Sequence, residues 1–305
     1  MFGVAEAMVI VLPCKAMLWT IDDFLQADFP EAPAVIKPIL PTMGLMLIHG
    51  QQTSGKTQLA LDIALSVARG DLFLDLYPCE RGPVVYFQFD QPRRMFQSRI
   101  HRAQDRARNQ PFYVVSDFGY HNILKWAKKP TDTIKAAQDL EPALVVFDSF
   151  QRCHQLDENL AGSIQAVYTA MHSMFPKSSK VTLHHENKNT ETAASHKMRG
   201  STALLDDANA GIRVHRKGRG KGGTHRASLE FTKVSTIEEP KPINVLMDPR
   251  TLLMEREETP TSRELAQSYL WAKPETTLHE MAEFLVDHDI CGKSNAYQIG
   301  QELGL

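Results

Sequence analysis

The residues best suited to chemistry lie in one octapeptide: Gly50, Gln51, Gln52, Thr53, Ser54, Gly55, Lys56 and Thr57. This spacing of two glycines, a lysine and a threonine is typical of a loop that wraps phosphates. Glycine lets the backbone approach a phosphate closely, and the N–H groups of a following helix favour an anion. We therefore expect Lys56 to contact the β and γ phosphates of a nucleotide and the Thr57 hydroxyl to bind Mg²⁺.

Two aspartates follow apolar runs farther along the chain. Asp148 comes after the run 143–147, and a carboxylate there predicts a second group that holds Mg²⁺ through water. Asp90 comes after the run 84–89 and is a candidate for polarising the attacking water. The alternative for Asp90 is a strand-end residue that caps the helix beginning near Pro92.

The elements that must position these residues are strands alternating with helices, from about residue 45 to residue 232. Strands are expected at 45–49, 84–89, 143–147 and 181–183, and helices at 57–69, after Pro92 and across 164–174. This order predicts an α/β fold with a mainly parallel sheet flanked by helices. Ligands of such open sheets bind where the strands end, which places Asp90 and Asp148 near the loop at Gly50. Residues 211–215 and 227–232 are expected to form a hairpin.

The chain is expected to contain four parts. These are an N-terminal segment or arm (1–37), the α/β core (38–235), a linker or edge hairpin (236–260) and a small helical domain (261–305). In the last part Thr277 and Glu280 fit a capping box, and a further helix is expected over 294–303. These helices could form a helix-turn-helix, and the alternative is a lid or docking domain.

Composition limits the partners. The 305 residues carry a net charge of −2, so a nucleic-acid site must be a local basic patch. No apolar run approaches the roughly 18 residues of a membrane span. The four cysteines include no closely spaced pair, as expected for reduced thiols in a cytoplasmic protein.

With the octapeptide 50–57, Asp90 and Asp148 at these positions, the chain resembles the RecA-like P-loop ATPases. Within them it is similar to the RepA-like hexameric helicases of plasmids and phages, which are related to DnaB-type helicases. The resemblance covers about residues 38–233. Besides the octapeptide it rests on Asp90 with Pro92, on 148–150 with 157–159, on the segment LHHENK at 183–188 and on RGSTA at 199–203.

The resemblance implies roles and partners. His185, or alternatively His184, contacts the γ-phosphate of ATP, while Asp148 and Thr57 hold Mg²⁺. Arg216 acts as an arginine finger on the nucleotide of a neighbouring subunit, with Arg199 as the second candidate. The expected assembly is a homo-oligomer, a hexameric ring on single-stranded DNA, with a primase, polymerase or other replication protein as a further partner.

The chain departs from the family at two positions. The family has Glu where Asp90 stands, and a side chain one methylene shorter predicts slow turnover. RepA-like members place an arginine finger where this chain has Asn209. The alternative for Arg216 is a solvated basic turn, and one of the two adjacent histidines could be a core residue.

Two segments are candidates for binding nucleic acid. The first is the glycine-rich basic stretch 213–226, with Lys217, Arg219 and Lys221. The second is the polar loop 186–200, with Lys188, Lys197 and Arg199. Both can follow a phosphate backbone, and the alternative for the first is a solvated, mobile loop. No aromatic residue stands among the charges of the first stretch, so base stacking is not expected there.

The sequence favours an ATP-driven motor on nucleic acid, and a replicative DNA helicase is the leading interpretation. The same core could instead coat and anneal single strands in recombination, or load a partner. A third interpretation is a nucleotide-switched assembly protein without motor activity. ATP hydrolysis measured with and without single-stranded DNA separates the third interpretation from the others.

Overall fold

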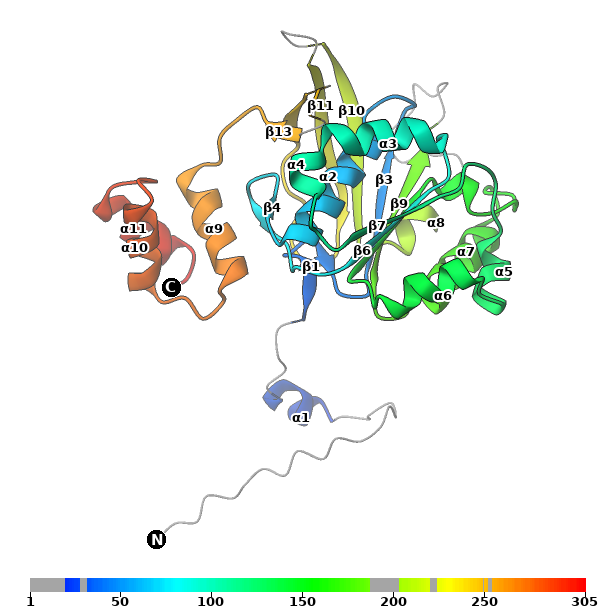
Figure 1. The fold of residues 1–305 in the computed structure, drawn as a ribbon. Helices are drawn as coiled ribbons and strands as arrows, with labels where there is room; N and C mark the ends of the chain where they lie inside the picture. The colour runs from blue at the N-terminus through cyan, green and yellow to red at the C-terminus, as the bar shows by residue number, and fades with distance from the viewer. Residues whose placement is uncertain (1–19, 28–31, 187–202, 220–223, 249, 252–253) are drawn as a thin grey trace. The chain divides into compact units, whose positions relative to one another are not determined.

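The computed structural model describes residues 20–27, 32–186, 203–219, 224–248, 250–251 and 254–305 (Figure 1). The chain divides into two units, Met1–Ala32 and Pro33–Leu305. The smaller unit contributes helix α1 (Ile21–Gln26), on which Ile21, Phe24 and Leu25 are exposed. All features below belong to the larger unit.

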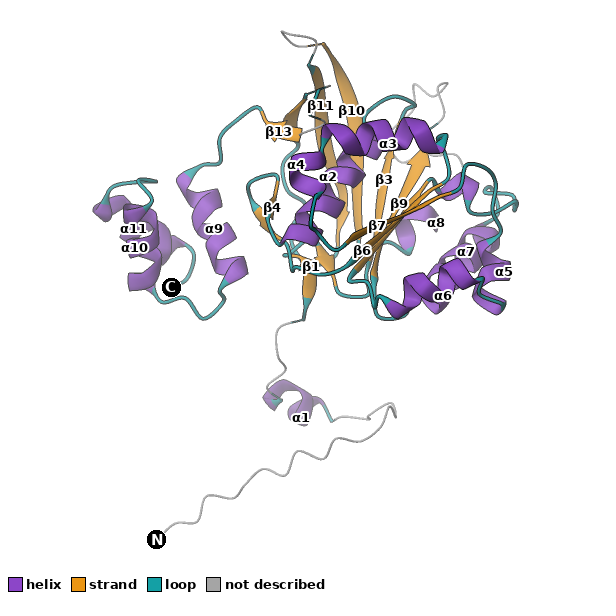
Figure 2. Ribbon diagram, in the orientation of Figure 1, coloured by secondary structure: helices purple, strands orange, loops and turns teal. Residues whose placement is uncertain are grey.

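A nine-stranded sheet forms the centre of this unit, in the order β13-β12-β11-β10-β3-β9-β8-β6-β7 (Figure 2). Its strands are β3 (Leu45–Gly50), β6 (Val84–Gln88), β7 (Phe112–Ser116), β8 (Leu144–Asp148), β9 (Ser179–His185), β10 (Ala210–Arg219), β11 (His225–Val234), β12 (Ile243–Met247) and β13 (Met254–Arg256). The pairs from β10 through β7 are parallel. The mainly parallel α/β sheet predicted from the sequence is confirmed.

Helices cover both faces of the parallel strands, because alternate residues of a strand point to opposite faces. Ile48 and Val146 pack with α2 (Lys56–Arg69) and α3 (Arg93–Arg102), while Leu47 and Val145 pack with the helices of the other face. Those helices are α5 (Ile123–Lys128), α6 (Asp132–Asp139), α7 (Ala161–Met174) and α8 (Ala203–Asp206). Both faces are therefore buried, which explains the continuous apolar runs of β6 and β8.

Helix α2 begins at Lys56, near the end of the octapeptide 50–57, which we call the phosphate-type loop. The helix is buried along nearly its whole length. Gly70 ends it in the left-handed conformation, with φ of 74°. The short elements nearby are β1 (Ala34–Ile36), β2 (Leu40–Pro41), β4 (Leu72–Phe73), β5 (Tyr77–Pro78), α4 (Gln104–Ala107) and the 3₁₀ helix η1 (Phe150–Arg152). Val35 and Ile36, which were expected to belong to the N-terminal segment, are buried in the core of the larger unit.

The predicted hairpin is present and longer than expected, because β10 and β11 pair antiparallel from Ala210↔Val234 to Arg219↔His225. The stretch predicted as a linker or edge hairpin contains β12 and β13, which extend the sheet in antiparallel fashion. Strand β7 was not predicted from the sequence; it lies at the other edge of the sheet, where Tyr113 and Val114 are exposed.

Three helices end the chain: α9 (Ser262–Ala272), α10 (Leu278–Asp287) and α11 (Lys293–Glu302). They share a small core that includes Ala266, Met281 and Ile299. The predicted capping box of Thr277 and Glu280 is present, and α9 has a second one. Each box satisfies backbone N–H groups that the first helical turn leaves without partners.

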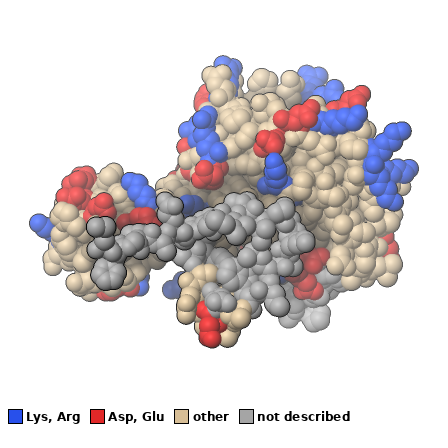
Figure 3. Space-filling view, turned by 90° about the horizontal axis from the view of Figure 1, so that it is seen from below, with Lys and Arg blue, Asp and Glu red and all other residues tan. Residues whose placement is uncertain are grey.

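The surface has no dominant sign of charge on the face drawn in Figure 3, where basic and acidic side chains of the described residues are interspersed. This mixture agrees with the small net charge of the chain. Among the described helices none is long and apolar enough to cross a membrane.

Candidate nucleotide-binding site

The phosphate-type loop leaves the end of β3 and leads directly into α2. Gly50 and Gly55 adopt positive φ values of 150° and 109°, which side chains with a Cβ rarely tolerate. A Cβ on Gly50 would lie 2.6 Å from the backbone oxygen of Val214, and one on Gly55 would lie 2.4 Å from Cε of Met247. The close approach of the β10 backbone therefore requires a glycine at position 50, while Gly55 is required mainly by its positive φ, because the Met247 side chain can move.

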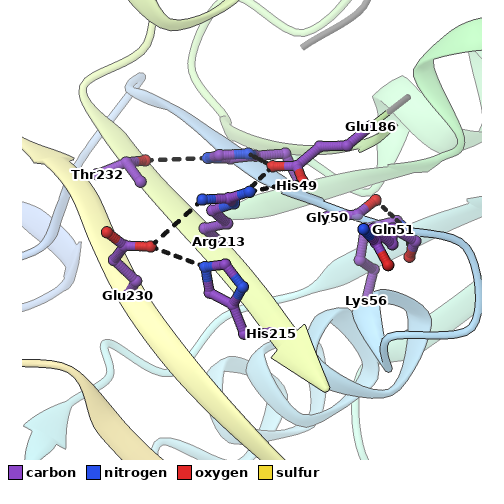
Figure 4. Close-up of polar contacts among 9 residues, drawn as sticks. All are labelled: His49, Gly50, Gln51, Lys56, Glu186, Arg213, His215, Glu230 and Thr232. Carbon is purple, nitrogen blue, oxygen red and sulfur yellow. Dashed lines mark hydrogen bonds and ion pairs between the residues drawn. The ribbon is translucent and has the colours of Figure 1, made fainter. Parts of the chain in front are cut away.

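Lys56 is held inside this loop (Figure 4). Its Nζ donates hydrogen bonds to the backbone oxygens of Gly50 at 2.9 Å and Gln51 at 2.8 Å. Burial lowers the pKa of Lys56 to about 8, although the carboxylates of Asp148, Glu186 and Asp90 act in the opposite direction. The ammonium group is thus placed where the loop would enclose phosphates, with acidic groups close by.

Asp148 ends β8 next to Thr57, the other residue expected to hold Mg²⁺. Burial raises the pKa of Asp148 to about 6, while hydrogen bonds from Tyr86 and Thr57 act against that rise. The Tyr86 hydroxyl donates to Oδ2 at 2.9 Å. A hydroxyl and a carboxylate in contact are oxygen donors of the kind that Mg²⁺ binds together with phosphate oxygens. Thr57 and Asp148 would therefore hold the ion, which supplies positive charge to the phosphates.

Asp90 lies at the end of β6 between two partners. Its Oδ1 accepts a hydrogen bond from Nε of Arg152 at 3.3 Å, and its Oδ2 lies 3.9 Å from Nε2 of His185. The His185 contact lowers the pKa of Asp90 most, burial opposes it, and Arg152 lowers the pKa further. The alternative role as a helix cap has no support, because Pro92 is the N-cap of α3 and no side chain caps that helix.

The two adjacent histidines point to opposite sides of β9. His184 is 2% exposed, and its Nε2 lies 3.0 Å from Oε2 of Glu158. His185 instead lines the cavity beside the phosphate-type loop. Nδ1 of His185 and Oγ of Ser54 are buried and have no hydrogen-bond partner within the described part of the chain. Ser54 and His185, which carry these two unpartnered atoms, both line the cavity.

These groups surround one cavity of about 630 Å³, a volume typical of small-molecule sites. Its wall includes four residues of α3 that were not predicted as site residues: Met95, Ser98, Arg99 and Arg102. Their spacing of three, four and seven places them on one helical face, so the sequence did contain a signal for them. The positive charge of Arg99 favours the ionised form of Asp148. Arg99 is thus a cation that this chain itself supplies at the site.

Arg216 lines the same cavity from β10. Its Nη2 lies 3.1 Å from Nδ1 of His225 across the hairpin. The side chain is exposed, and the expected action on a neighbouring subunit stays a prediction. Asn209 is structural: its Oδ1 accepts from the backbone N–H of Leu45 at 2.9 Å, which joins the start of β10 to β3.

A buried polar cluster, consisting of His49, Glu186 and Arg213, lies behind the loop (Figure 4). Oε1 of Glu186 accepts from Arg213 at 2.8 Å and lies 2.8 Å from Nδ1 of His49. A second Arg213 nitrogen donates to Oε2 at 3.0 Å, which makes the pair bidentate. Since the Glu186 backbone N–H donates to Gly50 O at 3.0 Å, this cluster joins the base of the loop to the hairpin. Sequence reasoning missed it because its members are far apart in the chain: His49 lies on β3, Glu186 directly follows β9, and Arg213 lies on β10.

The cluster predicts a dependence of stability on pH. Burial alone would raise the pKa of Glu186, but its contacts with His49 and Arg213 lower it, to about 2 from the ordinary 4.5. A carboxyl group with a lowered folded pKa stabilises the fold above pH 4.5 and loses this contribution as pH falls towards 2. Urea unfolding across this range should show a shallower pH slope in Glu186→Gln, by up to about 1.4 kcal/mol per pH unit. Equal slopes in both proteins would contradict the assignment.

The structure describes only some of the residues that were predicted to contact nucleic acid. Lys188, Lys197, Arg199 and Lys221 lie outside the described residues, as does the side chain of Arg219. Lys217 is exposed on β10, and its Nζ donates to Oδ1 of Asn244 at 2.8 Å. The hairpin that carries Lys217 and Arg219 also carries Arg216, so a basic segment continues directly from the cavity wall.

The fold and the site define a RecA-like P-loop ATPase, in which the phosphate-type loop follows β3, and Asp148 and Asp90 lie at and just beyond the ends of β8 and β6. The chain belongs to the family described as "AAA domain", whose sequence model matches residues 12–191.

Solved structures that share the fold include the following two. One of them, described as an ATPase domain, is 13% identical, with a TM-score of 0.54 over 71% of this chain and 85% of that chain. A KaiC-like protein from Pyrococcus horikoshii is 12% identical, with a TM-score of 0.52 over 73% of this chain and 94% of that chain. Identities this low show a common fold alone.

Proposed function

We propose that this protein is an ATP-dependent, oligomeric motor on single-stranded DNA, and that its task is that of a replicative helicase of the phage or plasmid type. The observation that carries the proposal is the shared wall of the cavity. The loop, Asp148, Asp90 and His185 meet there with Arg216, and Arg216 stands on the strand that continues into the basic hairpin. The cavity proposed to hold ATP and the hairpin proposed to hold the DNA backbone thus share Arg216.

The proposed reaction is hydrolysis of ATP to ADP and phosphate. Lys56 and the loop hold the phosphates, and Asp90 orients the water that attacks the γ phosphorus. His185 contacts the γ-phosphate, so its position changes when that phosphate leaves. Arg99 and Arg216 oppose the negative charge that develops in the transition state.

Two measurements test the proposal. Single-stranded DNA should stimulate ATP hydrolysis, and the protein with ATP should separate a labelled strand from a partial duplex. Annealing of strands in place of separation would favour the recombination or loading alternative. Turnover near zero with and without DNA would favour the nucleotide-switched assembly protein, an alternative supported by the pairing of Asp90 with Arg152.

The remaining assignments are proposals of the same kind. Light scattering with a non-hydrolysable ATP analogue should give the mass of a homo-oligomer, expected to be a hexameric ring. The terminal helices 261–305 carry seven acidic and three basic residues, which favours a lid or a docking domain for a replication partner over a DNA-binding helix-turn-helix. The expected cytoplasmic location stays a prediction.

Arg216→Ala should leave ATP binding intact and lower turnover about 100-fold or more, because a cation that opposes transition-state charge is lost. Phosphate release and binding of a fluorescent ATP analogue measure the two quantities. Mixing Arg216→Ala with Lys56→Ala tests the expected action on a neighbour. Turnover returns if Arg216 of one subunit serves the loop of the next, and stays low if it serves its own. Wild-type turnover in Arg216→Ala alone would rule out the finger.

A further inference from the structure

Two aromatic side chains, Phe118 and Tyr120, are exposed beside the candidate site, on the loop between β7 and α5. They are 53% and 56% exposed. The loop is nevertheless held in place, because Gly119 N–H donates to Phe89 O at 3.1 Å and His121 N–H donates to Arg152 O at 2.7 Å. Ordered aromatic rings that remain in water are typical of a binding surface.

Arg152 connects these rings to Asp90. Its guanidinium carbon lies 4.3 Å from the Tyr120 ring centroid and 5.6 Å from that of Phe118. The same guanidinium group donates to Asp90 from Nε. A carboxylate that accepts from an arginine is a weaker acceptor for water, since one of its oxygens is already engaged. A ligand that stacks on the face of Tyr120 against which this guanidinium lies must displace Arg152, and that displacement breaks its hydrogen bond to Asp90.

The residues around these two rings favour the bases of a single strand of nucleic acid as the ligand that stacks on them. Every base has a face that can stack on an aromatic ring, whatever its sequence. A polar cleft of about 590 Å³ adjoins Tyr120, and Gln151, Gln155 and Asn159 in its wall can hydrogen-bond to base edges. Asp157 and Glu158 also line the cleft, so phosphates are disfavoured inside it.

Phosphates have a better place near the start of the aromatic loop. Arg93 is exposed at the start of α3, and its Nη2 donates to the backbone oxygen of Ser116 at 3.1 Å, directly before the aromatic loop. Arg94 is exposed next to it. A strand whose bases enter the cleft can therefore lay its backbone along basic side chains.

We propose that Phe118 and Tyr120 form a stacking surface for bases of single-stranded nucleic acid, and that a stacked base draws Arg152 away from Asp90, which then orients the attacking water. This inference rests on the proposed function and adds to it the way in which the strand controls hydrolysis. It places base contacts outside the basic hairpin, where no aromatic residue stands among the charges.

Binding by the full chain tests the stacking surface. The probes are an oligothymidylate and an abasic strand of equal length, which keeps the phosphates and lacks the bases. Tyr120→Leu should weaken oligothymidylate binding about tenfold and leave abasic-strand binding unchanged, because only stacking is lost. Tyr120→Phe keeps the ring and should bind as the wild type does, and Phe118→Leu repeats the test on the second ring.

Turnover tests the part played by Arg152. Arg152→Gln should raise ATP hydrolysis without DNA about threefold to tenfold and remove most of the stimulation by oligothymidylate, because Asp90 is already released. A merely structural arginine would not increase turnover when removed. Turnover at or below the wild-type level in Arg152→Gln overturns the control of Asp90.

The outcomes separate this inference from the proposed function. If DNA neither binds nor stimulates the wild type, both fail. If DNA stimulates the wild type and folded Tyr120→Leu and Phe118→Leu bind both probes as the wild type does, only the stacking surface fails. If light scattering shows that Tyr120→Leu breaks the assembly into smaller species, the rings serve contacts between copies and the inference is overturned.

Discussion

Replacing Lys56 by alanine should reduce ATP turnover at least about 100- to 1,000-fold. The change removes an ammonium group that donates to the backbone of the loop and lies beside the carboxylates of Asp148, Glu186 and Asp90. Without this charge the nearby carboxylates would repel a triphosphate, and only the N–H groups of the loop and of α2 would still favour it. Phosphate release measures turnover, and a fluorescent ATP analogue measures binding.

A matched control for this variant is Lys135→Ala, which removes an exposed lysine of α6 that pairs with Asp132. It should keep turnover and melting temperature at their wild-type values. If Lys56→Ala melts as the wild type does and still hydrolyses ATP at the wild-type rate, the loop is not the phosphate site.

Glu186→Gln should lower the free energy of unfolding by about 3 kcal/mol. Glu186 and Arg213 are almost fully buried, with side chains 2% and 7% exposed, and glutamine leaves the Arg213 charge without its counter-ion. Removing one partner of a buried pair is costly because the other charge stays out of water. Urea unfolding at neutral pH measures the loss.

Glu230→Gln is the control for this second variant. Glu230 contacts the same arginine at 3.8 Å, but its side chain is 38% exposed, so water can replace it. The expected loss is below about 1 kcal/mol. Equal losses of unfolding free energy in Glu186→Gln and Glu230→Gln would show that burial does not make the Glu186–Arg213 pair more important for stability.

The helices and strands predicted from the sequence are present, and the structure mainly corrects their lengths and adds strands that were not predicted. The strands that end at Gly50, Gln88 and Asp148 lie where apolar runs predict them, since strands buried on both faces need such runs. Strand β7 escaped prediction because an edge strand is half in water and its pattern is weak. The hairpin β10–β11 is longer than predicted because its outer half is polar and is defined by pairing, which a single segment does not reveal.

The sequence by itself determined the phosphate-type loop, the carboxylates at two strand ends and the α/β class, because each depends on residues close together in the chain. The tertiary structure alone decided which groups meet. Arg152 lies against Asp90, α3 turns Arg99 into the cavity, and Glu186 joins β3 to β10 by way of Arg213. These contacts join residues far apart in sequence, and the order of strands in the sheet, rather than local spacing, brings them together.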